Sequence, residues 1–366
     1  MEPRTSAAEA TPTRREALST LRRASPPDAG RPPTIYDVAR EAGVSHQTVT
    51  RYLKGFEGIR PATRERVEAA LVRLDYRPNL TARSLTTGRS HRIGALTHEI
   101  DQFGPSKVVL GASAAAREAG YVLDIVALDM GSTESIAQAL DLLRQHDLAG
   151  VIALSSTDEM THAFESARFG VPVVLSTEPD DTAHGRTELS TVGFPALIAH
   201  LAGLGHRTFR HLAGPPTWSA ARNRTRAYEA AVEAHGLRSA GVLHGDWSAR
   251  SGYEAVRAID GDLGATALVA ANDQMALGAM LALAERGLDV PGDVSVTGVD
   301  DVPDAAFYSP PLTTLRVDFA DQGRTAVAAL LGQIEGGRDG AGRAASRPEL
   351  VVRRSTGPAQ PQPATA

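Results

Sequence analysis

The stretch TIYDVAREAGVSHQTVTRYLKG, residues 34–55, has the pattern of two short helices joined by a tight turn. Thr34 is followed three positions later by an acidic residue, which is the capping-box spacing that marks the start of a helix. Gly43 supplies a turn, and Ser45 is placed to cap a second helix that we expect to end at Leu53. The segment therefore predicts a helix–turn–helix unit.

A third helix is predicted directly downstream. Pro61 stands at the first helical position, which proline favours because its missing N–H is not needed there. Arg60 precedes it in place of a capping residue, a loss worth about 1 kcal/mol. The helix presents apolar residues at helical spacing, namely Val67, Leu71 and Leu74. Residues 34–78 are thus expected to form a small all-α domain.

Charge separates the two ends of the chain. Residues 1–90 hold 16 basic and 10 acidic residues, whereas the rest of the chain holds 22 basic and 33 acidic residues. A basic head on an acidic body favours contact between the head and a polyanion. The alternative is a basic tail that only interacts with solvent.

The second helix of the head carries side chains that are suited to reading DNA. In a helix–turn–helix unit this helix enters the major groove, and its first residues face base edges. Glutamine pairs with adenine, arginine pairs with guanine, and a threonine methyl group contacts the thymine methyl. The candidates are His46, Gln47, Thr48 and Arg51. No acidic residue lies between Val44 and Phe56, which favours DNA binding over a merely solvated helix face.

After residue 90, apolar runs alternate with helical patterns. The runs are residues 93–96, 122–128, 151–154, 171–175, 209–213, 267–271 and 294–299. Strands that alternate with helices of roughly a dozen residues are typical of βαβ units and parallel sheets. Seven strands over about 260 residues suit two sheets better than one. We therefore predict an α/β body with parallel sheets.

Several classes of protein are excluded by what the sequence lacks. It has no cysteine, hence no disulfide, thiolate metal site or cysteine nucleophile, as is usual in a reducing cytoplasm. The most apolar long stretch, residues 267–284, is interrupted by Asn272, Asp273 and Gln274, and the N-terminus lacks the apolar core of a signal peptide. No common catalytic motif is present, and the eleven histidines are scattered. We predict a cytoplasmic protein without contact to membranes, not an enzyme, with no catalytic residue, metal or cofactor.

Residues 34–55, together with TRERVEAALVRLDYRPNLTARSL at residues 63–85, resemble the DNA-binding head of the lactose repressor (LacI) family of transcriptional regulators. The resemblance continues to about residue 357. It is carried by LGHRTFRHLAGP, GDWSARSGYEA, VAANDQMALGAMLAL, DVSVTGVDD and SPPLTTLRVDF. Several of these pieces, GDWSA and ANDQMALGAM above all, are closer to the name-giving member than to the family average.

The resemblance implies that a homodimer binds double-stranded, pseudo-palindromic operator DNA, so that the protein associates with the nucleoid. It also implies that residues 79–87 form a hinge helix on the operator, with Leu85 wedged into the minor groove and Ala82 small enough for two hinge helices to approach. The residues expected to bind DNA or to support that binding are Thr34, Tyr36, Ser45, His46, Gln47, Thr48, Arg51, Asn79, Ala82 and Leu85.

The body resembles the two-lobed, periplasmic-binding-protein-like core of the family, with an effector between the lobes at the carboxyl ends of strands. Open α/β sheets favour that location on their own account. The expected domains are a disordered tail (1–33), the helix–turn–helix domain (34–78), a hinge or linker (79–90), the core (91–357) and a disordered tail (358–366). Within the core, lobe 1 is expected at about 91–189 and 317–346, and lobe 2 at about 190–316 and 347–357.

Four residues of the second lobe are expected to bind the effector: Arg222, Trp247, Asn272 and Asp300. An arginine forks onto hydroxyls or a carboxylate, and an indole offers a flat face to a sugar ring. Each residue also has a purely structural alternative. Asn272 would cap a helix, Asp300 would belong to a turn, Trp247 would be a buried anchor, and Arg222 would lie on a solvated face.

On the first lobe the resemblance implies effector contacts from Phe103, Pro105 and Ser106, and from Phe319 in RVDF. Two departures concern charge. Ser176 stands where the name-giving member has Asp, and Met130 stands where it has Arg. Both exchanges remove charge from the cleft, so the effector need not be a β-galactoside.

The predicted function is therefore that of a sequence-specific regulator, a repressor of carbohydrate-utilisation genes that a small sugar or glycoside releases from DNA. One alternative is a sugar-binding transport-type protein, which has no use for the DNA-binding head. A second is a family regulator that responds to a purine or a phosphosugar.

The resemblance by itself suggests a tetramer, because the name-giving member tetramerises through a C-terminal leucine heptad helix. Residues 357–366 contain three prolines and no apolar seam, so they cannot form such a helix. We therefore predict a dimer, held together through the body. Ala279 and Leu283 are candidates for its interface, with burial in the core as the alternative.

Overall fold

The computed structural model describes residues 31–77, 90–128, 133–155, 157–177, 192–336 and 347–360. The chain divides into two compact units, Met1–Gly88 and Arg89–Ala366, which are treated separately below. Four residues singled out above, Asn79, Ala82, Leu85 and Met130, lie outside the described residues, as do most of the two predicted tails. Within the described ranges, no helix is both long and apolar enough to cross a membrane.

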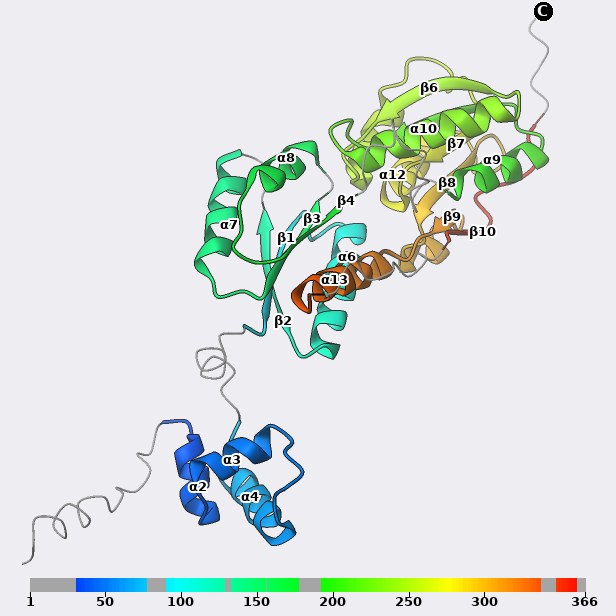
Figure 1. The fold of residues 1–366 in the computed structure, drawn as a ribbon. Helices are drawn as coiled ribbons and strands as arrows, with labels where there is room; N and C mark the ends of the chain where they lie inside the picture. Colours follow the sequence, from blue (N-terminus) through cyan, green and yellow to red (C-terminus); the bar gives the residue numbers. More distant parts are fainter. Residues whose placement is uncertain are drawn as a thin grey trace, which may run out of the picture. The chain divides into compact units, whose positions relative to one another are not determined.

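The first unit contains the three predicted helices, α2 (Ile35–Ala42), α3 (His46–Leu53) and α4 (Pro61–Arg73) (Figure 1). Gly43 ends α2 in the left-handed conformation with φ of +62°, which glycine adopts without strain. The hydroxyl of Ser45 accepts a hydrogen bond from the N–H of Thr48 at 3.2 Å and thereby begins α3. Val38, Val49 and Val67, one from each helix, are fully buried together. The predicted helix–turn–helix fold is confirmed.

The second unit contains two sheets, and the sheet of lobe 1 is entirely parallel. Its strands are β1 (Arg92–His98), β2 (Val122–Leu128), β3 (Gly150–Ser155) and β4 (Val173–Thr177), in the order β2-β1-β3-β4. Helices α7 (Thr133–Gln145) and α8 (Asp158–Ser166) cover one face, and α6 (Phe103–Glu118) and α13 (Phe319–Ile334) cover the other (Figure 1). Lobe 1 is thus a three-layer α/β structure.

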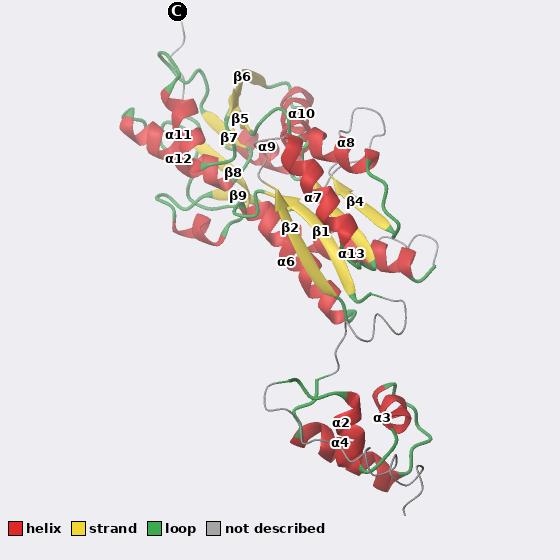
Figure 2. Ribbon diagram, turned by 90° about the vertical axis from the view of Figure 1, so that its left-hand side faces the viewer, coloured by secondary structure: helices red, strands yellow, loops and turns green. Residues whose placement is uncertain are grey.

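Lobe 2 is built on a six-stranded sheet in the order β10-β9-β8-β7-β5-β6. The strands are β5 (Thr208–Ala213), β6 (Arg238–His244), β7 (Ala267–Ala270), β8 (Ser295–Asp300), β9 (Thr313–Arg316) and β10 (Glu349–Val351), and only β10 is antiparallel to its neighbour. One hydrophobic core contains residues of α9 (Phe194–Gly203) and α10 (Ser219–Ala234). The core on the other face contains residues of α11 (Ala249–Arg257) and α12 (Asp273–Glu285) (Figure 2).

The prediction of two mainly parallel sheets is confirmed, and all seven predicted apolar runs lie in or overlap strands. Three strands, β6, β9 and β10, were not predicted. β6 is an edge strand whose residues are mostly exposed or half-buried, so it has no continuous apolar run. β9 and β10 have only four and three residues. A pattern of apolar residues does not detect strands of either kind.

The chain crosses between the lobes more than once. After β9 of lobe 2, α13 returns to lobe 1, where it packs against α6 and the sheet. The chain then comes back to lobe 2 as β10, which pairs with β9. Each lobe is therefore built from separated segments of the sequence.

Two helix pairs approach so closely that glycine is required at the contact. A Cβ atom on Gly111 of α6 would overlap the backbone of Ala320 in α13, and one on Gly323 of α13 would overlap the carbonyl oxygen of Val108 in α6. α11 and α12 meet in the same way through Gly252 and Gly278. Backbone contact of this kind fixes the position of each helix in its pair.

The segment after β10 lies against lobe 2. Ser355 is fully buried, and its hydroxyl donates to the carbonyl of Val296 at 2.6 Å. The N–H of Gly357 donates to the hydroxyl of Ser295 at 3.0 Å, and the N–H of Ala359 donates to the carbonyl of Leu204 at 2.9 Å. Of the predicted tail from residue 358, Ala359 is therefore hydrogen-bonded to the lobe.

Candidate DNA-binding surface and effector cleft

The head exposes the predicted DNA-reading residues on and beside α3. His46, Gln47 and Arg51 are exposed, and the ring of Tyr36 lies 5.2 Å from the ring of His46. Tyr36 is itself 62% exposed. The Arg51 guanidinium lies 5.5 Å from the centre of the Phe56 ring. Aromatic and basic side chains thus form one surface without an acidic residue in α3.

Thr34 and Ser45 act as helix caps within this surface. Asp37 is buried and accepts hydrogen bonds from both the N–H of Thr34, at 2.9 Å, and its hydroxyl, at 2.6 Å. These hydrogen bonds from Thr34 lower the pKa of Asp37, as do the charges of Arg31 and Arg40. The carboxylate therefore stays ionised and fixes the start of α2, which carries Tyr36.

A line of aromatic and charged side chains connects the two lobes of the second unit. His98 ends β1 in lobe 1, and its ring meets the Trp218 ring of lobe 2 edge to face at 4.7 Å. The two indoles of Trp218 and Trp247 are 5.6 Å apart. The guanidinium of Arg224 lies 5.5 Å from the Trp247 ring and 3.7 Å from the carboxylate of Asp300. Most of these residues lie at or just beyond strand ends, where open α/β sheets favour ligand binding.

Asp300 is a buried acid of this group. It ends β8 with φ of +117°, and only 6% of its surface is exposed. Burial raises its pKa to about 7, although the positive charge of Arg224 opposes that shift. One of its carboxylate oxygens, Oδ1, is buried without a hydrogen-bond partner among the described residues. A buried acceptor of this kind is prepared to receive a hydrogen bond from a ligand.

The arginine beside Asp300 is Arg224, whereas the sequence analysis had selected Arg222. Arg222 donates to Asp158 of lobe 1 at 2.8 Å and to the carbonyl of Pro216 at 2.7 Å. It therefore joins the two lobes at the edge of the cleft, next to a β-bridge between Thr157 and Trp218. Helical spacing gives the signal that was missed. Arg224 lies on the buried face of α10. Ala221, Tyr228 and Ala231 lie on the same face, because they are spaced from Arg224 by whole helical turns.

Asn272 and Trp247 are held to each other. The side-chain oxygen of Asn272 accepts from the N–H of Met275 at 2.9 Å, so Asn272 caps α12. Its side-chain nitrogen donates to the carbonyl of Trp247 at 2.9 Å and supports that residue at φ of +73°. Both ends of the Asn272 amide are thus engaged, while the indole N–H of Trp247 is buried without a partner among the described residues.

The predicted residues of lobe 1 lie at the first turn of α6 and the start of α13. The rings of Phe103 and Phe319 are 6.3 Å apart, edge to face. The hydroxyl of Ser106 donates to the carbonyl of Phe103 at 2.8 Å, and Pro105 belongs to the same turn. Phe103 also packs against both hydrophobic cores of lobe 2, so it joins the lobes. Ser176 lies in β4 and is half-buried.

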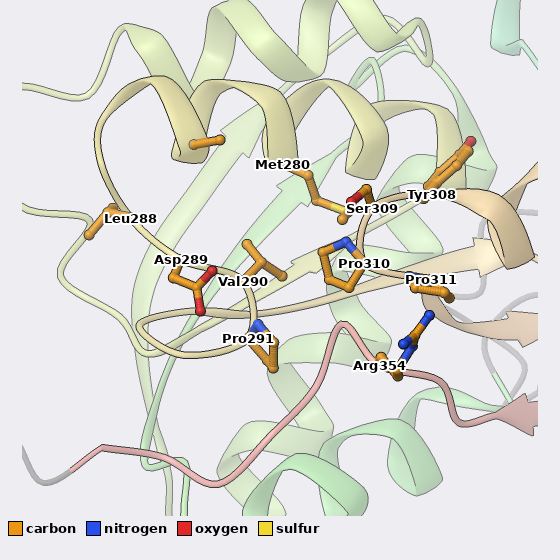
Figure 3. Close-up of a pocket in the computed structure, with 11 residues that line it drawn as sticks. Met280, Leu288, Asp289, Val290, Pro291, Tyr308, Ser309, Pro310, Pro311 and Arg354 are labelled. Carbon is orange, nitrogen blue, oxygen red and sulfur yellow. The ribbon is translucent and has the colours of Figure 1, made fainter.

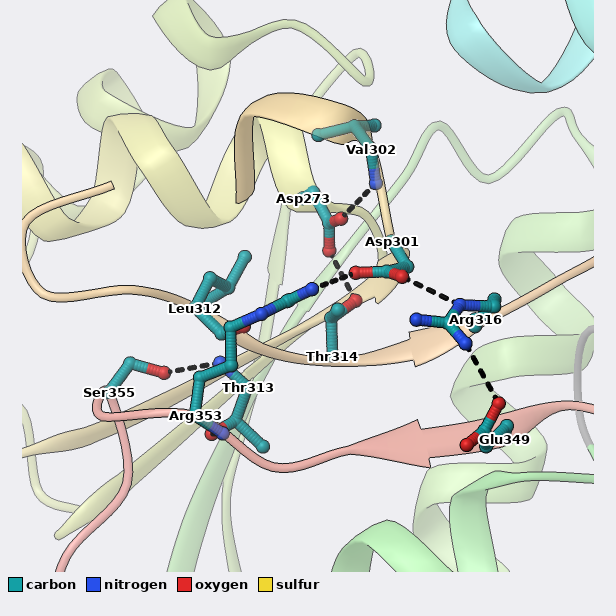
Figure 4. A network of polar contacts seen from close by, with 10 residues as sticks. All are labelled: Asp273, Asp301, Val302, Leu312, Thr313, Thr314, Arg316, Glu349, Arg353 and Ser355. Atoms are coloured by element: carbon teal, nitrogen blue, oxygen red, sulfur yellow. Dashed lines mark hydrogen bonds and ion pairs between the residues drawn. The ribbon is translucent and has the colours of Figure 1, made fainter. Parts of the chain in front are cut away.

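A second group of acids lies directly behind Asp300. Asp301 accepts from Arg316 at 2.7 Å and from Arg353 at 2.6 Å, and Figure 4 shows it between these two arginines. Asp273 is fully buried, and its carboxylate accepts hydrogen bonds from the N–H of Val302 at 2.8 Å and from the hydroxyl of Thr314. Burial and the nearby Asp300 raise the pKa of Asp273 well above its usual value. Asp273 thus fixes the loop that follows Asp300.

A pocket of about 500 Å³ lies on lobe 2 (Figure 3). Polar and apolar atoms line it about equally, and Figure 3 shows Asp289 and Arg354 at its two sides. Its lining residues are Met280, Ala284, Leu288, Asp289, Val290, Pro291, Tyr308, Ser309, Pro310, Pro311 and Arg354.

In the described part of the chain, no three His, Asp or Glu side chains are grouped so that they would hold a metal ion.

Together, the helix–turn–helix head and the two-lobed α/β core define a class of protein, the DNA-binding regulators with a two-lobed core. Residues 34–79 match the family described as bacterial regulatory proteins, lacI family, and residues 198–356 match the periplasmic binding protein-like domain. The lactose operon repressor of Escherichia coli (strain K12) is 35% identical over 329 residues, which cover 89% of this chain and 91% of that protein.

The transcriptional repressor PurR of Haemophilus influenzae (strain ATCC 51907 / DSM 11121 / KW20 / Rd) is 32% identical over 332 residues, covering 88% of this chain and 98% of PurR. A crystal structure of the lac repressor dimer bound to operator and the anti-inducer ONPF has a TM-score of 0.78 to this chain at 34% identity, covering 89% of this chain and 100% of that one. The chain belongs to the LacI family of DNA-binding transcriptional repressors, which are not enzymes.

Proposed function

We propose that this repressor binds a pseudo-palindromic operator as a homodimer and that a small sugar or glycoside in the cleft lowers its affinity for that DNA. Such a repressor acts in the cytoplasm, where the operator is. The proposal rests on the exposed reading residues of α3, on the buried polar and aromatic side chains where the lobes meet and on the similarity to the lac repressor. The released genes would be those that serve the use of the same sugar.

On the DNA side, we assign base contacts to His46, Gln47 and Arg51, all exposed on α3. Tyr36 and Thr48 would support them at the groove edge. Asn79, Ala82 and Leu85, which lie outside the described residues, would form the hinge helix in the minor groove.

On the effector side, one observation carries the proposal. Three buried polar atoms around the paired indoles have no hydrogen-bond partner among the described residues: Arg224 Nε, Trp247 Nε1 and Asp300 Oδ1. Native proteins satisfy nearly all such atoms, so their convergence on one cleft indicates a polar ligand. Indole faces bind the C–H surface of a sugar ring, while a carboxylate and a guanidinium bind its hydroxyls.

For the dimer, α12 presents an apolar stripe to solvent. Leu277 is 40% exposed and Leu281, one helical turn later, is 57% exposed. The residues suggested by the sequence, Ala279 and Leu283, are instead fully buried in the lobe 2 core, so that suggestion is replaced. The stripe and the pocket of Figure 3 are both formed in part by α12, and we propose that a second copy of the chain covers this face. A structure of the related lac repressor is a dimer bound to operator.

The DNA-binding part of the proposal is tested with an operator that the wild-type protein selects from a random pseudo-palindromic library. Gln47→Ala is expected to relax the preference at one base of each half-site by about 1–3 kcal/mol, because it removes a bidentate contact. The measurement is fluorescence anisotropy across single-base operator variants. Gln145→Ala, an exposed glutamine of α7, is the matched control. Unchanged base preference in the Gln47 variant contradicts the assignment of α3.

A purine effector is a second candidate. It is favoured by the similarity to PurR and by the two indoles of the cleft, since a flat base also stacks on an indole face. Titration of the repressor–operator complex with adenine, guanine, lactose, maltose and cellobiose separates the two candidates. Release of operator by a purine base and by none of the sugars would favour this second candidate.

A further inference from the structure

His98 is a buried polar residue of the cleft that the sequence analysis did not select. It lies at the carboxyl end of β1, and only 1% of its surface is exposed. Neither ring nitrogen has a hydrogen-bond partner among the described residues. An unsatisfied buried nitrogen costs about 1–3 kcal/mol, so a ring with two of them is destabilising unless something else binds them.

The position of the ring identifies what it faces. Its edge-to-face contact with Trp218 at 4.7 Å places it at the lobe 1 end of the line of residues that leads through Trp247 and Arg224 to Asp300. The unpartnered atoms of lobe 2 lie along the same line. A ligand in the cleft would therefore be bound by His98 from one lobe and by Asp300 from the other.

The protonation state of His98 determines what it offers. Burial lowers its pKa to about 4, so the imidazole is neutral near pH 7. A neutral imidazole has one N–H donor and one nitrogen acceptor, on opposite sides of the ring. That combination matches hydroxyl groups, which both donate and accept.

The charges around the ring disfavour an anionic ligand. Glu99 follows His98, is half-buried, and has its pKa raised by burial and by the negative charges of Asp101 and Asp246. Asp300 closes the other end of the cleft. Arg224 already lies against Asp300 and donates to the carbonyl of Ala271, and Arg222 is bound to Asp158. A phosphate group would therefore meet the acidic side chains of Glu99 and Asp300, while the charges of Arg224 and Arg222 are already paired with carboxylates.

We propose that His98 determines the specificity of the cleft for an uncharged sugar: its neutral ring donates one hydrogen bond to the ligand and accepts another, both to hydroxyls. This inference rests on the proposed sugar-responsive function and specifies its ligand class. Since His98 belongs to lobe 1 and Asp300 to lobe 2, the sugar connects the lobes, and its binding is coupled to their relative position.

The test uses the intrinsic fluorescence of the full-length protein. The chain has two tryptophans, Trp218 and Trp247, and both belong to the proposed binding site. A bound sugar is therefore expected to change the tryptophan fluorescence, and no label is needed. The probes are lactose, maltose and cellobiose, with glucose 6-phosphate against glucose and with adenine. Operator affinity in the absence of any probe is measured in parallel by fluorescence anisotropy, as a check that each variant is folded and dimeric.

The variants are His98→Leu, which removes both polar atoms, and His98→Gln, which keeps a donor and an acceptor. His162→Leu, an exposed histidine of α8 in the same lobe, is the matched control. We expect His98→Leu to weaken binding of the active sugar about ten- to hundredfold. His98→Gln should recover at least part of that loss and alter the ranking of the sugars, and His162→Leu should behave as the wild type.

The outcomes separate this inference from the proposed function. Wild-type sugar affinity in His98→Leu overturns the role of His98 while the sugar-responsive function stands. If His98→Leu does not fold, an unaltered sugar ranking in His98→Gln overturns it equally. Tighter binding of glucose 6-phosphate than of glucose overturns the uncharged ligand class. A wild-type protein that responds to adenine and to none of the sugars contradicts the proposed function itself.

Discussion

Asp300 lowers the stability of the folded state when its carboxyl group is ionised. Its carboxyl group is buried, and its pKa is raised to about 7 from an ordinary value of 3.8. The folded protein therefore binds more protons at this site than the unfolded chain between about pH 4 and pH 7. Stability contributed by this site falls as the pH rises through that range, and the full penalty is present above pH 7. A residue kept at such a cost is expected to serve ligand binding.

Asp300→Asn is therefore predicted to become more stable relative to the wild type as the pH rises from 5 to 8. The shift of about three pKa units sets an upper limit of about 4 kcal/mol, which the loss of the charge opposite the buried Arg224 will reduce. Sugar affinity should fall in the same variant. Urea denaturation at several pH values measures the stability difference. The exposed Asp304→Asn is the matched control, and a difference for Asp300→Asn that does not change with pH would contradict the prediction.

At the residue scale, sequence reasoning selected several residues that the structure groups together, but not every residue of that group. Asp300, Trp247 and Asn272 were selected from motifs, and they lie together in the structure. Arg224 was missed in favour of Arg222, because both occur in one helix and only the buried face distinguishes them. His98 was missed because a histidine at a strand end has no sequence signature. The feature that distinguishes His98 is that its buried ring nitrogens have no hydrogen-bond partner among the described residues. That feature depends on packing in three dimensions, so the sequence does not show it.

At the scale of elements, α6 and α13 form a rigid pair in lobe 1. Gly111 and Gly323 allow the two backbones to touch, as no other residue would. The pair also carries Phe103 and Phe319, whose rings meet at the side of the cleft. The packing of these helices therefore sets the position of two candidate effector residues.

Gly323→Ala is predicted to separate α13 from α6 and to destabilise the protein by about 1–3 kcal/mol, the usual cost of overpacking. The added methyl group would overlap the carbonyl oxygen of Val108, which belongs to the backbone and cannot rotate away. Gly203→Ala is the matched control. Gly203 ends α9 with open space around it, so alanine there should be neutral or stabilising by up to about 1 kcal/mol. Thermal unfolding compares the two, and equal effects would count against the close contact.

The fold was largely predictable at the element scale, because long apolar runs and helix caps are local signals. Ser45, Pro61 and Gly43 mark helix boundaries in the sequence, and the structure has them at those positions. The short strands β9 and β10 have no such signal. Their pairing depends on segments more than 30 residues apart, and the ion pair of Arg316 with Glu349 that joins them is visible only once the strands are paired.

At the scale of the whole molecule, the exposed stripe on α12 bears on the oligomeric state. Leu281→Arg is predicted to abolish the dimer at micromolar concentration, because burying an unpaired guanidinium in an apolar interface is costly. Operator affinity should then fall, since one head reaches only one half-site. Leu142→Arg, on the exposed face of α7 in lobe 1, is the matched control and should remain dimeric. Sedimentation velocity measures both. A monomeric wild type, or a stable wild-type tetramer, would contradict this assembly.

The separated segments of the two lobes have a consequence for synthesis. The head has its whole hydrophobic core within residues 35–76, so it can fold as soon as those residues have left the ribosome. Lobe 1 waits for α13, and lobe 2 waits for β10 and for Ser355 and Gly357. A nascent chain thus acquires its DNA-reading surface first and both lobes of the effector cleft only at the end. Premature termination before α13 or β10 would therefore leave a complete head attached to an incomplete core.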